Sequence, residues 1–377
     1  MNFKDLNIES NLISLLSKNG IVTPTPVQID TIPEIIKGND IIAKSKTGSG
    51  KTLAFLLPLL QGMSNRTRDI EVLVLSPTRE LAIQITEEAN KFNINEIGIL
   101  AAYGGKDVGS QLKKLNKGIK LVIATPGRLL DHIERDNINL NKIKTVVIDE
   151  ADQMLLMGFK NEIEKVMSFV PKKTQVLCFS ATIDSTVKKL AYRYMNEPCI
   201  IDITENETSK VPNIKQEVIK TTDRWKVDAL AKMMEEDNPF MAIIFCRTKR
   251  RADELELKLA EKRIKVSKLH SDIPQSKREK IMKSFKACDI QYLIATDVAA
   301  RGIDVSGVTH IYNYDCPENV ESYIHRIGRT GRAGDSGYTC LITDPKNYPV
   351  LEEIEEYLGF KIKERTVETN RKFIEYK

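Results

Sequence analysis

The chain is organised around the stretch Ser45-Lys46-Thr47-Gly48-Ser49-Gly50-Lys51-Thr52, which follows the apolar run Ile41-Ile42-Ala43. A strand, a glycine-containing turn and a helix in this order surround phosphate oxygens with backbone N–H groups. We expect Lys51 to meet the β- and γ-phosphates and Thr52 to hold Mg²⁺ through its hydroxyl group. The strict pattern begins with glycine where this chain has Ser45. A coincidental Gly/Ser turn is the alternative, and the flanking strand and helix argue against it.

A pair of carboxylates follows a second apolar run. Val146-Val147-Ile148 precedes Asp149 and Glu150, and ligands bind at the carboxyl ends of strands in open α/β sheets. We expect Asp149 to hold Mg²⁺, directly or through water, and Glu150 to orient and deprotonate an attacking water. Alone, such a pair is more often a helix cap or a solvated loop. The upstream phosphate loop reverses that expectation and predicts hydrolysis of a nucleotide.

The composition is that of a soluble globular protein, with 41% hydrophobic and 29% charged residues. The N-terminus has no uninterrupted apolar core, and the most apolar run, Leu53 to Leu60, is short and broken by Pro58. We therefore expect no signal peptide and no membrane span, and a cytoplasmic location. The net charge of +5 permits nucleic-acid binding without requiring it. Scattered cysteines and histidines predict buried thiols and no metal cluster.

Short β-branched runs alternate with amphipathic stretches along the whole chain. Almost unbroken Val, Ile and Leu content is expected for strands buried on both faces of a parallel sheet. The expected strands are 40–43, 72–75, 121–124, 145–148, 176–179, 242–245, 292–295, 310–313 and 338–342. Helical patterns lie between them, for example at 79–92 and 249–262.

At 377 residues the chain fits two domains of typical size. The polar stretch around 204–213 contains a proline and no periodicity, which is typical of a linker. We predict an N-terminal domain at 1–206 that binds the nucleotide, a linker at 207–213 and a C-terminal domain at 214–345. The remaining residues, 346–377, are expected to form a short, charged, helical tail.

The tetrapeptide Asp149-Glu150-Ala151-Asp152 resembles the signature of the DEAD-box ATP-dependent RNA helicases, and other signatures follow in family order. The resemblance runs from Phe3 to about residue 334, which is most of the chain. It implies an α/β fold with two tandem RecA-like domains, each a mainly parallel sheet flanked by helices. It also implies ATP and Mg²⁺ as cofactors and single-stranded RNA as the partner, with every residue from Ser45 to Thr52 contacting ATP.

The segment Gly20 to Gln28 resembles the family's adenine-reading motif, with Phe3 as its upstream aromatic residue. A glutamine amide can bond both the N6 and N7 positions of adenine, and Phe3 is expected to stack on the base. Without the resemblance, Phe3 would be a core residue and Gln28 a polar group at a helix start.

Several segments that follow strands resemble the family's RNA-backbone contacts. Arginines form bidentate bonds to phosphate, and hydroxyl and backbone groups supply further donors, which predicts weak sequence preference. These residues are Pro77, Thr78, Arg79, Gly105, Thr125, Arg128, Arg247 and Thr296. A set of helix caps and turns is the alternative, and both roles can coexist.

The resemblance assigns the remaining motifs to coupling and catalysis. Ser180 and Thr182 resemble the motif that couples hydrolysis to unwinding, although chemistry alone suggests an N-cap. Asp304 is expected to reach the ATP ribose. A further group recurs near three-residue spacing, which crowds one side of a helix: His325, Arg326, Arg329 and Arg332. By resemblance Arg329 and Arg332 are arginine fingers and the other two take part in coupling, whereas a surface arginine face is the alternative.

We therefore predict an ATP-dependent RNA helicase that clamps single-stranded RNA and locally unwinds short duplexes. One alternative is an ATP-gated RNA clamp or scaffold with little unwinding. Another is a DNA-directed helicase, because the choice of RNA rests on the resemblance. A plain metabolic ATPase or kinase would leave the motifs of the second half unexplained.

Overall fold

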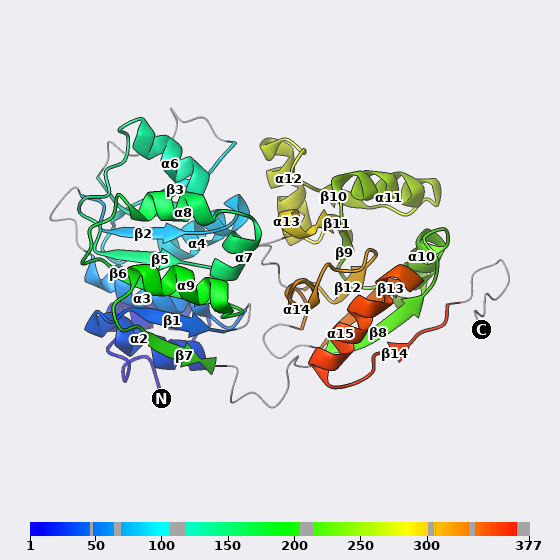
Figure 1. The fold of residues 1–377 in the computed structure, drawn as a ribbon, viewed down its shortest axis with the longest axis horizontal. Coiled ribbons are helices and arrows are strands. Elements are labelled where there is room, and N and C mark those ends of the chain that lie inside the picture. The colour runs from blue at the N-terminus through cyan, green and yellow to red at the C-terminus, as the bar shows by residue number, and fades with distance from the viewer. Residues whose placement is uncertain are drawn as a thin grey trace. The chain divides into compact units, whose positions relative to one another are not determined.

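The computed structural model describes residues 1–45, 48–63, 69–105, 118–203, 214–300, 305, 307–331 and 336–367. Contacts divide the chain into two compact units, Met1–Glu207 and Thr208–Lys377 (Figure 1). Each unit contains its own seven-stranded sheet, and the strand pairs that the structure describes are parallel. The predicted α/β fold with two mainly parallel sheets is confirmed. The expected linker, 207–213, lies outside the described residues.

The sheet of the first unit has the strand order β3-β4-β2-β5-β6-β1-β7. Its strands are β1 (Ile41–Lys44), β2 (Val72–Leu75), β3 (Gly98–Ala102), β4 (Ile119–Ala124), β5 (Thr145–Ile148), β6 (Gln175–Ser180) and β7 (Cys199–Asp202). The helices are α1 (Ser10–Lys18), α2 (Pro26–Lys37), α3 (Lys51–Gly62), α4 (Arg79–Lys91), α6 (Pro126–Glu134), α7 (Ala151–Leu156), α8 (Lys160–Met167) and α9 (Ser185–Tyr194).

The sheet of the second unit has the order β10-β11-β9-β12-β13-β8-β14. Its strands are β8 (Ile214–Lys220), β9 (Ala242–Cys246), β10 (Ser267–Leu269), β11 (Tyr292–Thr296), β12 (His310–Asn313), β13 (Gly337–Thr343) and β14 (Lys363–Glu364). The helices are α10 (Lys226–Asp237), α11 (Lys249–Glu261), α12 (Gln275–Lys286), α13 (Asp297–Ala300), α14 (Val320–Ile327), η2 (Pro345–Asn347) and α15 (Tyr348–Leu358).

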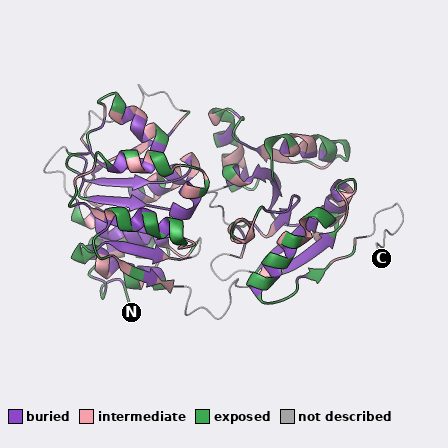
Figure 2. Ribbon diagram, viewed as in Figure 1, coloured by how far each residue is buried: buried purple, intermediate pink, exposed green. Residues whose placement is uncertain are grey.

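The unbroken apolar runs are explained by cores on both faces of each sheet. In β2, Val72 and Val74 belong to one buried cluster, whereas Leu73 and Leu75 belong to another. In β9, Ile244 and Phe245 likewise point into different clusters. Successive side chains of a strand point to opposite faces, so both faces must be apolar. Figure 2 shows the strands buried between helices with exposed outer surfaces.

The end of the chain differs from the prediction of a tail. Leu351, Ile354 and Leu358 on α15 pack into an apolar core of the second unit, and β14 pairs with β8. These apolar residues recur at helical spacing among glutamates, and this amphipathic pattern buries one face of the helix. Residues 348–364 are therefore part of the second unit and not a tail.

Several strands were not among those predicted, namely β3, β7, β8, β10 and β14. Most lie at or near sheet edges, where one side is less buried. Ile200 in the edge strand β7 is 53% exposed, and β8 contains lysines and a glutamate. Strands β8, β10 and β14 lack the continuous apolar run that marks a central parallel strand, whereas β3 and β7 are short apolar runs at the sheet edges.

The remaining expectations from composition concern thiols and membranes. Cys178, Cys246, Cys316 and Cys340 are buried free thiols, whereas Cys288 is exposed. Burial raises the pKa of Cys178 to about 12, so this thiol stays protonated. Among the described residues, no helix combines the length and apolar character that crossing a bilayer requires.

Candidate nucleotide and RNA sites

The phosphate loop leaves the sheet at the carboxyl end of β1. Lys44 lies opposite Ser180 of β6, and the Ser45 N–H donates to the Ser180 carbonyl at 3.0 Å. Gly48 and Gly50 have φ of 81° and 93°, in the left-handed region that favours glycine. Ser45 does not adopt a positive φ, so its position does not require glycine. Lys46 and Thr47, also predicted to contact ATP, lie outside the described residues.

The first turn of α3 carries the predicted phosphate and magnesium ligands. The Lys51 ammonium group is buried and donates to the Ser45 carbonyl at 3.0 Å. The Ser49 hydroxyl donates to the Ser45 Oγ at 3.2 Å. Thr52 is half-buried beside them. The loop thus holds its lysine close to the backbone that is expected to surround phosphate.

The two carboxylates lie two strands away, at the carboxyl end of β5. The Asp149 N–H donates to the Leu75 carbonyl at 3.0 Å, and the Glu150 N–H donates to Asp149 Oδ1 at 3.0 Å. Burial raises the pKa of Asp149 to about 7, while the nearby Lys51 charge opposes the shift. A buried ammonium group and a buried carboxyl group therefore lie near each other at this edge of the sheet.

Glu150 is held in an unusual conformation. Its φ of 51° lies in the left-handed region, where a residue with a side chain is strained. Its Oε2 is buried and has no hydrogen-bond partner among the residues that the structure describes. A buried acceptor without a partner carries a free-energy penalty, which a bound water or ligand would remove. This geometry suits a group that orients water.

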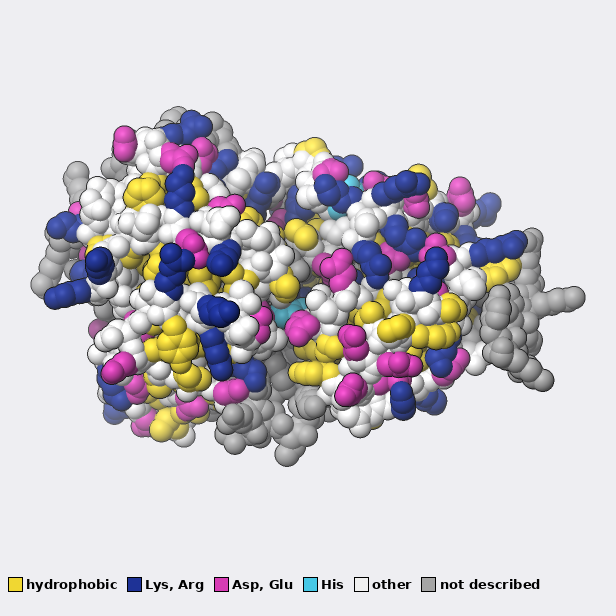
Figure 3. All heavy atoms as spheres, viewed as in Figure 1, with side chains coloured by type: hydrophobic (Ala, Val, Ile, Leu, Met, Phe, Trp, Pro, Cys, Tyr) yellow, Lys and Arg dark blue, Asp and Glu magenta, His cyan; other side chains and the backbone are white. Residues whose placement is uncertain are grey.

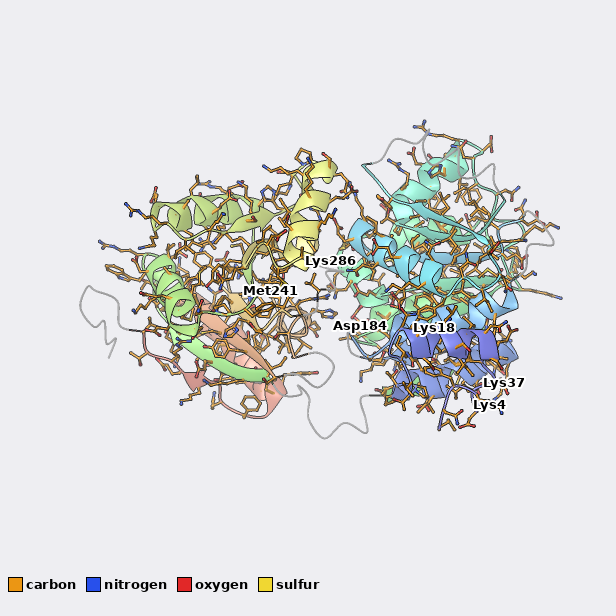
Figure 4. The ribbon with its side chains drawn as sticks, turned by 180° about the vertical axis from the view of Figure 1, so that it is seen from behind. Lys4, Lys18, Lys37, Asp184, Met241 and Lys286 are labelled. Atoms are coloured by element: carbon orange, nitrogen blue, oxygen red, sulfur yellow. The ribbon has the colours of Figure 1, made fainter. Side chains whose placement is uncertain are left out.

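The predicted coupling motif is tied to the end of the acidic tetrapeptide. The Asp152 N–H donates to Ser180 Oγ at 3.2 Å. The Thr182 N–H and hydroxyl both donate to Asp152 Oδ2 at 3.1 Å. The N-cap of α9 is Asp184, labelled in Figure 4, and not Ser180. Sequence reasoning missed Asp152, although its place in the tetrapeptide was a signal.

The strand order sorts the predicted sites of the first unit into two neighbouring groups. The phosphate loop and the two carboxylates follow β1 and β5, the coupling residues lie at the end of β6, and the RNA residues follow β2, β3 and β4. Since β2 pairs with both β4 and β5, the groups meet along one edge of one sheet. The carboxyl edge of a parallel sheet is where such folds bind ligands.

In the second unit, Thr296 and Arg247 lie at the ends of paired strands. Thr296 of β11 is opposite Cys246 of β9, directly before Arg247. The Arg247 Nη2 donates to the Cys316 carbonyl at 3.0 Å, and the residue remains exposed. A guanidinium fixed at one nitrogen still has donors for phosphate.

The arginine-rich segment forms the end of α14 and the turn after it. Arg326 is 2% exposed and makes a bidentate pair with Asp297 at 2.6 and 2.7 Å. Its Nη1 donates to Asn313 Oδ1 and to the Asp315 carbonyl. The Arg329 Nε donates to the His325 carbonyl at 3.2 Å. Asp304 and Arg332 lie outside the described residues.

These two units match known protein families. A family model described as DEAD/DEAH box helicase matches residues 25–190, and one described as helicase conserved C-terminal domain matches residues 225–334. The chain is 43% identical over 355 residues to the DEAD-box ATP-dependent RNA helicase CshA of Bacillus subtilis (strain 168). That alignment covers 94% of this chain and 72% of the relative. The chain belongs to the DEAD-box ATP-dependent RNA helicases.

Solved structures of DEAD-box proteins share the fold. S. cerevisiae Dbp5 bound to RNA and ADP BeF3 is 30% identical, with a TM-score of 0.87 over 96% of this chain and 95% of that one. A DEAD box protein from the hyperthermophile Methanococcus jannaschii is 38% identical, with a TM-score of 0.56 over 97% and 99% of the two chains. The tandem RecA-like fold of the helicase is therefore established.

The structure describes both residues that are expected to contact adenine, Gln28 and Phe3. The Gln28 amide accepts from the Thr25 N–H and donates to the Gly50 carbonyl, both at 3.0 Å, which leaves one acceptor position and one N–H for a base. A Cβ at Gly50 would lie 2.7 Å from Gln28 Nε2, so the close approach requires glycine. Phe3 is 2% exposed within the core. Its expected stacking on adenine stays a prediction.

In the helicase, some predicted RNA residues act as caps. Thr78 Oγ1 accepts from the Leu81 N–H at 3.2 Å and begins α4, so the cap interpretation is right for this hydroxyl. Thr125 precedes α6 without a side-chain cap bond. Arg79 lies against Gly104, and the Arg128 Nε is 3.6 Å from Asp131 Oδ2. Pro77 is buried and Gly105 is exposed.

The position of Arg326 predicts a structural effect in this helicase. Arg326→Ala is expected to destabilise the second unit by about 3 kcal/mol, because it leaves the half-buried Asp297 carboxylate and the buried acceptors of Asn313 and Asp315 without this partner. Trp225, the chain's single tryptophan, precedes α10 and reports unfolding of this unit by fluorescence in urea. The control Arg250→Ala removes a side chain that is 89% exposed and should change stability by at most about 0.5 kcal/mol. Equal losses of unfolding free energy in both variants would contradict this structural role of Arg326.

Proposed function

We propose that this helicase clamps single-stranded RNA through its backbone and separates short duplexes locally, using ATP hydrolysis. The observation that carries the proposal is the buried Glu150 carboxylate, whose Oε2 has no partner among the described residues. It stands beside Asp149 and on the same sheet edge as the phosphate loop. A strained, unsatisfied carboxylate at such a place supports a role as the base that activates water.

We assign Mg²⁺ to the hydroxyl of Thr52 and the carboxylate of Asp149. Both offer the oxygen ligands that Mg²⁺ prefers, and Asp149 is buried with a raised pKa, a state that a bound cation would reverse. The ion would neutralise charge on the phosphates during transfer. Lys51 binds the phosphates, and Gln28 binds adenine with its remaining acceptor and donor.

The second unit completes this chemistry in the proposal. Arg329 and Arg332 stabilise the charge that develops on the phosphates, and Asp304 binds the ribose. His325, together with Ser180 and Thr182, couples ATP hydrolysis to RNA unwinding. The structural role of Arg326 supports coupling only indirectly, because it anchors Asp297 next to Thr296.

RNA binding is assigned to the strand-end residues of both units. They are Pro77, Thr78, Arg79, Gly105, Thr125, Arg128, Arg247 and Thr296. Backbone N–H groups and guanidinium groups dominate this set, which supports contact with phosphates and weak base preference. Because ATP and RNA would favour the same closed state of the protein, each raises the affinity for the other.

The decisive experiment compares ATP hydrolysis with RNA and with DNA strands of the same sequence, followed by displacement of a short RNA duplex. We expect stimulation by RNA and strand displacement that requires ATP. Lys51→Ala, which removes the phosphate-binding ammonium group, is the negative control for both assays. Equal stimulation by DNA would favour the DNA-directed alternative. Stimulation without displacement would favour an ATP-gated clamp or scaffold.

A further inference from the structure

Helix α12 of the second unit carries a row of cations without acidic partners. Exposed lysines occupy every third position of the helix: Lys277, Lys280, Lys283 and Lys286. Within the described part of the chain, none of their ammonium groups has a carboxylate within salt-bridge distance. Glu279, the acidic residue of the helix, accepts a hydrogen bond from Gln275 at 3.2 Å. The positive charge of the row is therefore not balanced locally.

Several neighbouring cations of the same unit are paired. On and around α11, several lysine and arginine side chains lie 2.6–2.8 Å from a carboxylate oxygen: Lys249 with Asp272, Arg250 with Glu254, Lys262 with Asp228 and Lys268 with Asp253. Figure 3 shows basic and acidic side chains interspersed over the viewed face. The row on α12 differs from these pairs because four lysines at successive three-residue steps of one helix lack a carboxylate partner among the described residues.

Helix stability accounts for only part of the row, because Lys283 and Lys286 lie in the last turn, where the helix dipole favours cations. Like charges three residues apart oppose helix formation by a few tenths of a kcal/mol per pair. Lys277 also lies in the first turn, where the positive end of the helix dipole repels a cation. The helix buries only Arg278 and Phe285, and its N-cap Pro274 makes no side-chain cap bond. A bound polyanion would remove this repulsion.

The row begins at the edge of the sheet to which RNA binding is assigned. Strand β10 leads through His270 into α12, and β10 pairs with β11, which ends at Thr296. The Arg278 Nη1 donates to the His270 carbonyl at 2.9 Å, which fixes the start of the helix to this edge. The row then extends along α12 to Lys286, which Figure 4 labels at the end of the helix.

We propose that the exposed lysines of α12 bind the phosphate backbone of RNA that continues past the strand ends of the second unit. Neighbouring lysines of the row lie about 5–6 Å apart between their Cβ atoms, and each step turns by about 60° around the helix. Adjacent members such as Lys280 and Lys283 can therefore reach consecutive phosphates. Protein interfaces need a buried apolar centre, and none of the large exposed apolar residues lies on α12. The row therefore fits a nucleic-acid backbone better than an acidic protein.

The inference rests on the proposed function, and its test measures the salt dependence of RNA binding. The variant Lys280→Gln/Lys283→Gln keeps two side chains of similar length without their charge. Fluorescence anisotropy with a labelled RNA strand of about 16 nucleotides gives the affinity at several salt concentrations. We expect the slope of log K against log salt to become shallower by about 0.7 per lost phosphate contact. In about 0.1 M salt the affinity should fall roughly fivefold per contact.

The matched control is Lys172→Gln/Lys173→Gln. These two exposed lysines precede β6 in the first unit, at the amino edge of its sheet, and their replacement should leave the slope unchanged. An unchanged slope in the α12 variant, or an equal change in the control, would overturn the proposal. Urea unfolding followed by Trp225 fluorescence checks that the second unit stays folded. A wild-type protein whose ATPase ignores RNA would instead reject the proposed function itself.

Discussion

Glu150→Gln is expected to abolish ATP turnover while ATP-dependent RNA binding persists. Glutamine has nearly the shape of glutamate, and Glu150 Oε2 has no partner to lose among the described residues, so the fold should tolerate the change. The amide cannot accept a proton from water, and loss of a general base lowers rates by about 10²–10⁴-fold. Steady-state phosphate release and RNA anisotropy with ATP measure the two properties separately.

The control for this variant is Glu353→Gln, because Glu353 is an exposed glutamate of α15 in the second unit. It should hydrolyse ATP at the wild-type rate. The proposed role of Glu150 would be wrong if its variant still turned over ATP within a few-fold of wild type. The clamp scheme would be wrong if the variant folded but lost its ATP-dependent hold on RNA.

Arg329→Ala is expected to lower RNA-stimulated hydrolysis by about 10³–10⁵-fold, the range for loss of an arginine finger. This corresponds to about 4–7 kcal/mol of transition-state stabilisation. Binding of RNA without nucleotide should persist, because the residue is assigned to the phosphates of ATP. Lysine at this position keeps the charge without the planar fork, so Arg329→Lys should recover only part of the rate.

Folding must be checked for this variant, since Arg329 is 5% exposed and bonded to the His325 carbonyl. Trp225 fluorescence in urea serves this purpose, and Arg250→Ala provides an arginine control on the exposed face of α11. An unchanged RNA-stimulated rate in folded Arg329→Ala protein would remove the residue from the catalytic group. If unfolding caused the loss of rate, the urea transition of the variant, followed by Trp225 fluorescence, would also shift to lower urea concentration.

Local patterns predicted much of the framework. Ile41-Ile42-Ala43 and Thr145–Ile148 are strands because β-branched residues suit a pleat that is buried on both faces. Gly48 and Gly50 mark the turn because their φ values are positive, and that preference belongs to single residues. The edge strand β7 was not predicted because its apolar run is short. The packing of α15 was not predicted because its apolar residues are interspersed with glutamates.

The sequence by itself determined where the strands end and which chemical groups follow them, because backbone preferences and apolar runs act over a few residues. Only the tertiary structure decided which of those groups meet. It buried Phe3 in the core, turned Arg326 inward onto Asp297 and joined Asp152 to Thr182. Such contacts depend on strand order and on the desolvation of charges by distant segments, and neither can be read from neighbours along the chain.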